Sequence, residues 1–191
     1  LYYFNEILFA VSRFFEHRLS PNGFVSGVFL IAWGFFKKLV IADRLMPVLS
    51  VLVAAAQELP GWLVLATAAM YAIVLYADFS GGIDIIRGAA ELLGIDLPEN
   101  FRRPFFAASI ADYWRRWHIS LGSWFRDYVY IPLGGNRVSK AKWLRNILVV
   151  WMLTGLWHGA SWNFVLWGLG FAVLLVAEKL VYGRLLQRTH V

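Results

Sequence analysis

The stretch NILVVWMLTGLWHGASWNFVLWGLGFAVLLVA, residues 146–177, runs for 32 residues without Asp, Glu, Lys or Arg. A bilayer core requires about 20 apolar residues in a helix, so the stretch is too long for one span and too short for two complete ones. As one helix it would extend roughly 48 Å at about 1.5 Å per residue. We therefore expect it to bend, tilt or break near Thr154-Gly155 or Gly159, the positions around His158.

Two other uncharged runs fit one membrane span each, Leu19–Phe36 with 18 residues and Leu59–Ala77 with 19. The run Leu45–Gln57 has only 13 residues and contains Pro47, which favours a short or re-entrant helix. Asp78 and Asp84 flank Phe-Ser-Gly-Gly after the second span. Paired carboxylates can do acid–base chemistry, but here we expect them to hold a break between two helices.

The composition agrees with a membrane protein. Hydrophobic residues make up 60% of the 191 residues and charged residues only 16%, whereas soluble domains carry roughly 25% charged residues. The sequence therefore predicts an all-α, polytopic helical membrane protein with interfacial and re-entrant helices. The absence of cysteine excludes disulfides, thiolate zinc sites and cysteine nucleophiles. The chain begins with leucine and shows no signal peptide, so we expect residues 1–191 to be an internal piece of one longer membrane domain.

Residues 96–145 form a basic segment, with nine Lys or Arg against four acids. Positive residues beside spans favour the cytoplasmic side, so we expect this segment to be cytoplasmic or interfacial. Binding to lipid headgroups explains such a cluster better than binding to nucleic acid, which we do not expect. Lys37, Lys38 and Arg44 would share that side if the short helix between the spans returns.

Within the basic segment, Ser109 and Asp112 have the spacing of a helix N-cap. Apolar residues then recur at helical spacing from Ile110 to Tyr128, and His118 lies on the same stripe. This pattern predicts one amphipathic helix lying along the membrane interface. Residues 130–136, YIPLGGN, predict a loop.

His158 is the strongest candidate for a catalytic residue. Placing an ionisable group near the middle of a membrane costs free energy, so such a group indicates a functional site by default. A neutral histidine can take a proton from a hydroxyl as that hydroxyl attacks a carbonyl. The alternative is a neutral histidine that only hydrogen-bonds a neighbouring helix. His118 by itself fits interfacial packing better than chemistry. The four histidines, at 17, 118, 158 and 190, lack zinc-ligand spacing, and we expect no metal site.

Six motifs in order over residues 76–170 resemble the membrane-bound O-acyltransferase family, and especially its bacterial branch that contains the alginate O-acetylation membrane protein. They are Asp78-FSGG, Pro98-ENFRRP, Tyr113-WRRWHISL, Trp124-FRDY, Ile131-PLGGN and Leu156-WHGASW. The branch that transfers D-alanine to teichoic acid shares the R-W-H and W-H-G histidines. Many members have Gly-Tyr-Ser-Asp where this chain has Gly81-Gly-Ile-Asp84, which keeps the acid and loses the tyrosine.

The resemblance implies that His158 is the principal catalytic histidine and His118 the second one. We expect Trp117, Trp157, Arg126 and Asp127 to line the substrate path; for the last two, a local ion pair at the interface is the favoured alternative. The implied reaction moves an acyl group, most simply acetyl, from a cytoplasmic thioester to a hydroxyl of an extracytoplasmic polysaccharide. The donor would be acetyl-CoA or an acyl carrier protein, used as co-substrate with no bound cofactor.

The expected location is the bacterial inner membrane, crossed several times. The expected partners are the donor or its carrier protein inside, the polysaccharide or a partner acyltransferase outside, and membrane lipid. Three alternatives stay open: D-alanyl transfer to teichoic acid, a transporter core, and a non-catalytic assembly subunit. A transporter fits broken helices and an intramembrane histidine, but internal repeats are not visible in this sequence.

We predict that residues 96–145 face the cytoplasm, because translocating nine basic residues is unfavourable. Single cysteines at Ser139 and Pro60 of the otherwise cysteine-free chain can be treated with a membrane-impermeant thiol reagent. In intact cells the Pro60 position should react and the Ser139 position should not. The opposite pattern would reverse the assigned topology.

Overall fold

The computed structural model describes residues 21–182, and within that range it contains helices and loops but no β-strand. The chain divides into two compact units, Leu1–Pro98 and Glu99–Val191. Among the described residues, three helical stretches are long and apolar enough to cross a membrane: Pro21–Ala54, Gly61–Leu92 and Trp162–Val181. The predicted all-α membrane fold is confirmed. Leu19 and Ser20, at the start of the first expected span, lie outside the described residues.

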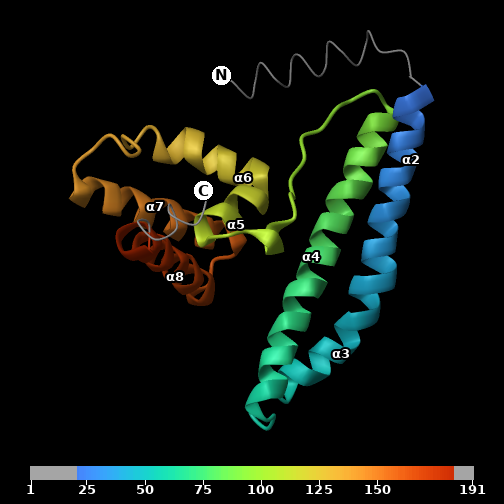
Figure 1. Cartoon of the computed structure of the whole chain (residues 1–191), viewed down its shortest axis with the longest axis horizontal. Coiled ribbons are helices and arrows are strands. Elements are labelled where there is room, and N and C mark those ends of the chain that lie inside the picture. Colours follow the sequence, from blue (N-terminus) through green and yellow to red (C-terminus); the bar gives the residue numbers. More distant parts are fainter. Residues whose placement is uncertain (1–20, 183–191) are drawn as a thin grey trace. The chain divides into compact units, whose positions relative to one another are not determined.

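The first unit is built on two long helical segments. Helix α2 (Pro21–Phe35) continues through the π-helical turn η1 (Phe36–Ala42) into α3 (Asp43–Ala54), and α4 (Gly61–Leu92) lies beside α2 (Figure 1). The expectation of a separate short or re-entrant helix around Pro47 is therefore wrong, because α3 carries Pro47 inside a continuous helical run. The widened turn of η1 precedes the proline. A π-helical turn or a proline can bend a helix without ending it.

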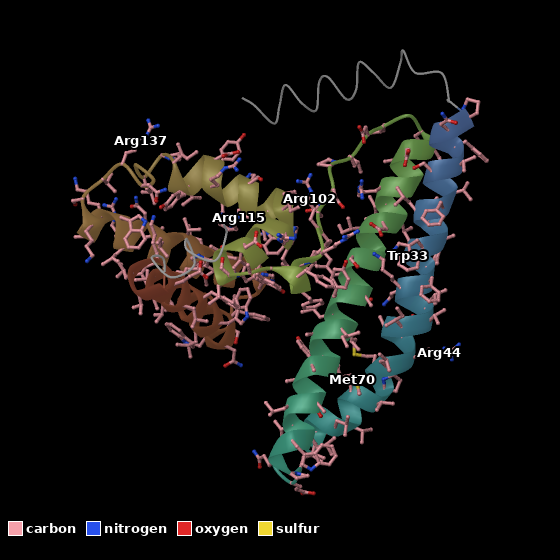
Figure 2. All side chains as sticks on the ribbon, in the orientation of Figure 1. Trp33, Arg44, Met70, Arg102, Arg115 and Arg137 are labelled. Atoms are coloured by element: carbon pink, nitrogen blue, oxygen red, sulfur yellow. The ribbon has the colours of Figure 1, made fainter. Side chains whose placement is uncertain are left out.

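Glycines bring α2 and α4 into backbone contact. A Cβ atom on Gly34 would lie 2.6 Å from the carbonyl oxygen of Gly81, and one on Gly88 would lie 2.5 Å from that of Gly27. Small residues at a helix–helix interface are typical of membrane proteins, where close backbone packing replaces the hydrophobic drive of water. The large apolar side chains instead point outward, as Figure 2 shows along both helices.

Two lysines of the first helical segment pair with aspartates of α4. Lys37, only 7% exposed, places its Nζ 2.7 Å from Oδ2 of Asp84 and 2.9 Å from Oγ of Ser80. Lys38 pairs with Asp78 at 2.5 Å. The two aspartates do not break a helix, contrary to expectation, since α4 runs through both of them. Each aspartate is instead paired with a lysine of the preceding helical run.

The second unit contains shorter elements. They are η2 (Pro104–Phe106), α5 (Ile110–Arg116), α6 (Ile119–Phe125), η3 (Arg126–Tyr130), α7 (Lys140–His158), α8 (Trp162–Ala177) and η4 (Glu178–Tyr182). The long uncharged run breaks directly after His158, as predicted, and α7 and α8 pack side by side (Figure 1). The predicted loop before α7 is also present. Its Gly134 and Gly135 have positive φ angles, and the buried Asn146 donates hydrogen bonds to carbonyl oxygens in this loop.

The single amphipathic helix predicted from Ile110 to Tyr128 is wrong, because it is interrupted at Trp117-His118. Helix α5 ends at Arg116 and α6 begins at Ile119. The interruption comes from the upstream residues 100–102, which pair with the chain at this point. Periodicity of apolar residues does not reveal such a partner.

We predict that Gly88→Ala destabilises the protein by about 1–3 kcal/mol, because the added Cβ would meet the backbone of α2 and cannot be accommodated by a side-chain movement. Gly82→Ala is the matched control on the same helix, since a Cβ there has nothing within 4 Å. The control should be neutral or slightly stabilising, as alanine favours helix over glycine. Thermal melting of the full-length protein in detergent measures both. Equal melting temperatures for the two variants would contradict glycine-mediated packing.

Candidate active site

Helix α5 is held at its start by two carboxylates and a serine. Ser109 is the N-cap, as predicted, and its Oγ accepts the N–H of Asp112 at 3.1 Å. Arg116 lies 2.9 Å from Asp112 and keeps the pKa of that carboxyl below its usual value. The sequence did not indicate the third contact: Glu178, far along the chain, accepts the N–H groups of Ile110 (2.6 Å) and Ala111 (3.2 Å). A carboxylate at this end of the helix satisfies free N–H groups.

At the other end of α5, the chain pairs with the extended segment that precedes it. The N–H of Arg102 donates to the carbonyl oxygen of Arg116 at 2.9 Å, and the N–H of Ile119 donates to that of Asn100 at 3.1 Å. Phe101 and Trp117 form the bridge between the two segments. These bonds use backbone groups that a continuous helix would need, so the helix ends.

His118 occupies the junction in a left-handed conformation, with φ 47° and ψ 55°. A residue with a β-carbon seldom adopts this conformation, and it persists only where the surroundings impose it. The ring nitrogen Nδ1 lies 3.3 Å from Oδ1 of Asn100. The preceding Trp117 is buried, stacks on Tyr113 with ring centroids 5.6 Å apart, and meets the Phe101 ring edge-on at 5.0 Å.

His158 is the last residue of α7 and is exposed in this unit. Glycines that bring α7 and α8 together, Gly155 and Gly168, each face backbone of the opposite helix. Ser161 then caps α8 through the N–H of Asn163. This tight turn presents the His158 ring to Trp167, whose centroid is 5.0 Å away.

Trp157 connects the two histidines. Its ring lies 5.0 Å from that of His158 and 5.8 Å from that of His118, edge-on in both cases. The fold thus brings together two histidines that are 40 positions apart in the sequence. Burial lowers the pKa of His118, and the nearby charge of His158 lowers it further, so His118 is neutral at neutral pH.

A cavity of about 380 Å³ opens beside His118. Its wall is mostly apolar and includes Trp114, Trp117, Ile147 and Trp151. His158, Trp157 and Asp127 are not among the described residues that line it. Apolar cavities with a few polar groups are typical of sites for small molecules or cofactors.

Two arginines, Arg115 and Arg126, also line the cavity. Arg126 is paired with Asp127 through bonds of 2.7 and 3.1 Å, which is the local ion pair considered from the sequence. Arg115 is 72% exposed in its side chain and lies 3.5 Å from Asp112. Within residues 21–182 no group of three His, Asp or Glu side chains is placed to hold a metal ion.

The sequence model of the membrane-bound O-acyltransferase (MBOAT) family matches residues 4–190 of this chain. This chain belongs to that family. It is 41% identical over 168 residues to the probable alginate O-acetylase AlgI of Azotobacter vinelandii, covering 86% of this chain and 33% of the relative.

The names of two other relatives refer to different acceptors. The peptidoglycan O-acetyltransferase of Helicobacter pylori is 39% identical over 172 residues, covering 90% of this chain and 32% of the relative. The teichoic acid D-alanyltransferase of Bacillus subtilis is 39% identical over 113 residues, covering 55% of this chain and 28% of the relative. The chain spans about a third of the length of the first two relatives.

Proposed function

We propose that this chain is the histidine-bearing part of a bacterial inner-membrane O-acyltransferase, crossing the membrane several times. It would transfer an acyl group, most simply acetyl, from a cytoplasmic thioester to a hydroxyl of an extracytoplasmic polysaccharide. The observation that carries the proposal is the pair of histidines on either side of Trp157, one of them in the wall of an apolar cavity. The names of the relatives from Azotobacter and Helicobacter support acetyl transfer.

The reaction requires one base, which removes a proton from the acceptor and later returns it. In our proposal His158 accepts the proton of the acceptor hydroxyl while the hydroxyl oxygen attacks the thioester carbonyl carbon. The tetrahedral intermediate then expels the thiolate as the C–S bond breaks, and the imidazolium returns the proton to sulfur. The products are an ester and a free thiol. His118 assists proton transfer or orients the donor, and the apolar cavity beside it excludes water from the thioester.

D-alanyl transfer to teichoic acid is the second candidate, favoured by the match to the Bacillus protein. The chemistry at the histidines is the same in both cases, so the two candidates differ in donor and acceptor alone. A transporter core or an assembly subunit would not transfer an acyl group. Acyl transfer by the full-length protein, and its loss when the histidines are substituted, therefore separates these classes.

We predict that His158→Ala and His158→Gln lower acyl transfer by about 10²- to 10⁴-fold, the usual contribution of a general base. Glutamine keeps the size and a hydrogen-bond donor but cannot accept a proton, so it should fail as alanine does. His118→Ala should be impaired less. Transfer from a radiolabelled thioester is measured with the full-length protein at matched membrane levels. Asn163→Ala, an exposed neighbour on α8, is the control and should keep activity. Near-normal transfer by both His158 variants would refute the catalytic assignment.

We also predict that the donor docks on the basic surface beside the cavity, since CoA phosphates and acidic carrier proteins both complement positive charge. Arg115→Glu should raise KM for the donor on the order of five- to tenfold at low salt and less at high salt. Arg102→Glu is the matched control, because Arg102 is 66% exposed, pairs with Glu99 and does not line the cavity (both arginines are labelled in Figure 2). Equal effects of the two reversals at every ionic strength would place the docking surface elsewhere.

A further inference from the structure

A single oxygen atom, Oδ1 of Asn100, faces three groups of the segment that follows α5. It lies 3.3 Å from Nδ1 of His118, 3.1 Å from the backbone nitrogen of Ser120 and 2.6 Å from Oγ of Ser120. The carbonyl oxygen of Asn100 also accepts the N–H of Ile119. Asn100 is therefore attached to the His118 junction by both its main chain and its side chain.

These contacts determine the protonation of the His118 ring. A backbone N–H can only donate, so the carboxamide atom that faces Ser120 must be the oxygen and not the NH₂ group. An amide oxygen can only accept, and Nδ1 of His118 therefore donates to it. A neutral imidazole carries one N–H, which leaves the lone pair on Nε2.

We propose that Asn100 is a positioning residue that holds His118 as the Nδ1–H tautomer, so that Nε2 is the atom that accepts a proton or hydrogen bond at the site. The tautomer is inferred from the hydrogen-bond geometry alone, whereas its use in acyl transfer rests on the proposed function. Asn100 lies in the motif at residues 98–104, one of the six that resemble the family, and the resemblance implied no role for this residue.

The tautomer distinguishes between the two roles considered for His118. A thioester carbonyl oxygen needs a hydrogen-bond donor, and neutral His118 presents no N–H at Nε2. A hydroxyl or thiol needs an acceptor, which Nε2 provides. His118 therefore assists proton transfer: the proton that His158 takes from the hydroxyl returns to the departing thiolate through Nε2 of His118. The burial that keeps this imidazole neutral preserves the acceptor.

The tautomer can be measured without any assay of activity. Nitrogen-15 NMR of the full-length protein with labelled histidine, at about pH 8, distinguishes a protonated from an unprotonated ring nitrogen; His118→Gln identifies the signals. We expect Nδ1 protonated and Nε2 unprotonated in the parent, and a shift toward the Nε2–H tautomer in Asn100→Leu. An Nε2–H tautomer in the parent, or an unchanged tautomer in Asn100→Leu, would overturn the proposal.

The kinetic test uses the same position. Asn100→Leu should lower kcat by about 10- to 100-fold, as the loss of the partner that orients a metal-ligating histidine does in metalloenzymes. Asn100→Asp keeps an acceptor oxygen and should restore much of kcat at high pH. Its carboxylate favours the imidazolium and raises the pKa of His118, so the acidic limb of the pH–rate profile should move to higher pH.

The other charged groups near His118 stay the same in these variants: His158 from α7, and Arg115 and Arg126 in the wall of the cavity. Glu99→Gln, an exposed neighbour that pairs only with Arg102 among the described ion pairs, should leave both kcat and the pH profile at parent values. An unshifted acidic limb in Asn100→Asp would refute the positioning role. If His118→Gln itself keeps full activity, the proposed function of His118 fails while the NMR result still decides the tautomer.

Discussion

The pairing of residues 100–102 with residues 116–119 is the constraint on which the candidate site depends. Two backbone hydrogen bonds and the contact of the Phe101 and Trp117 rings replace the helical bonds that would otherwise continue α5. The chain must therefore turn at His118, and the left-handed conformation there is the result. Without this pairing, the histidine would lie on a regular amphipathic helix with no fixed partner for its ring.

Helix α5 has only seven residues, and a helix so short is not stable alone in water. Its position comes from contacts at both ends, Glu178 at the start and the paired segment at the finish. Between them, Trp114 packs its ring 4.7 Å from Trp151 of α7 and 4.9 Å from Phe171 of α8. The helix that precedes one histidine is thus fixed to the helix that ends in the other.

Local sequence patterns predicted the features that depend on local physics. The uncharged runs indicated the apolar helices, Ser109 indicated the start of α5, and the glycines around His158 indicated the break between α7 and α8. The errors came from contacts between distant residues. Asp78 and Asp84 suggested a helix break because their lysine partners on the preceding helical run could not be recognised from spacing. Asn100 and Glu178 were not assigned roles for the same reason.

The buried pair of Lys37 and Asp84 has a consequence for how the first unit enters the bilayer. An isolated lysine or aspartate at the centre of an inserting helix costs about 2.5–3.5 kcal/mol. Lys37 lies in the middle of its helical segment and would meet this cost alone, whereas pairing with Asp84 reduces it. The glycines allow the two backbones to touch, and the ion pair forms between them. Both features therefore favour insertion of the two segments together, as one helical hairpin.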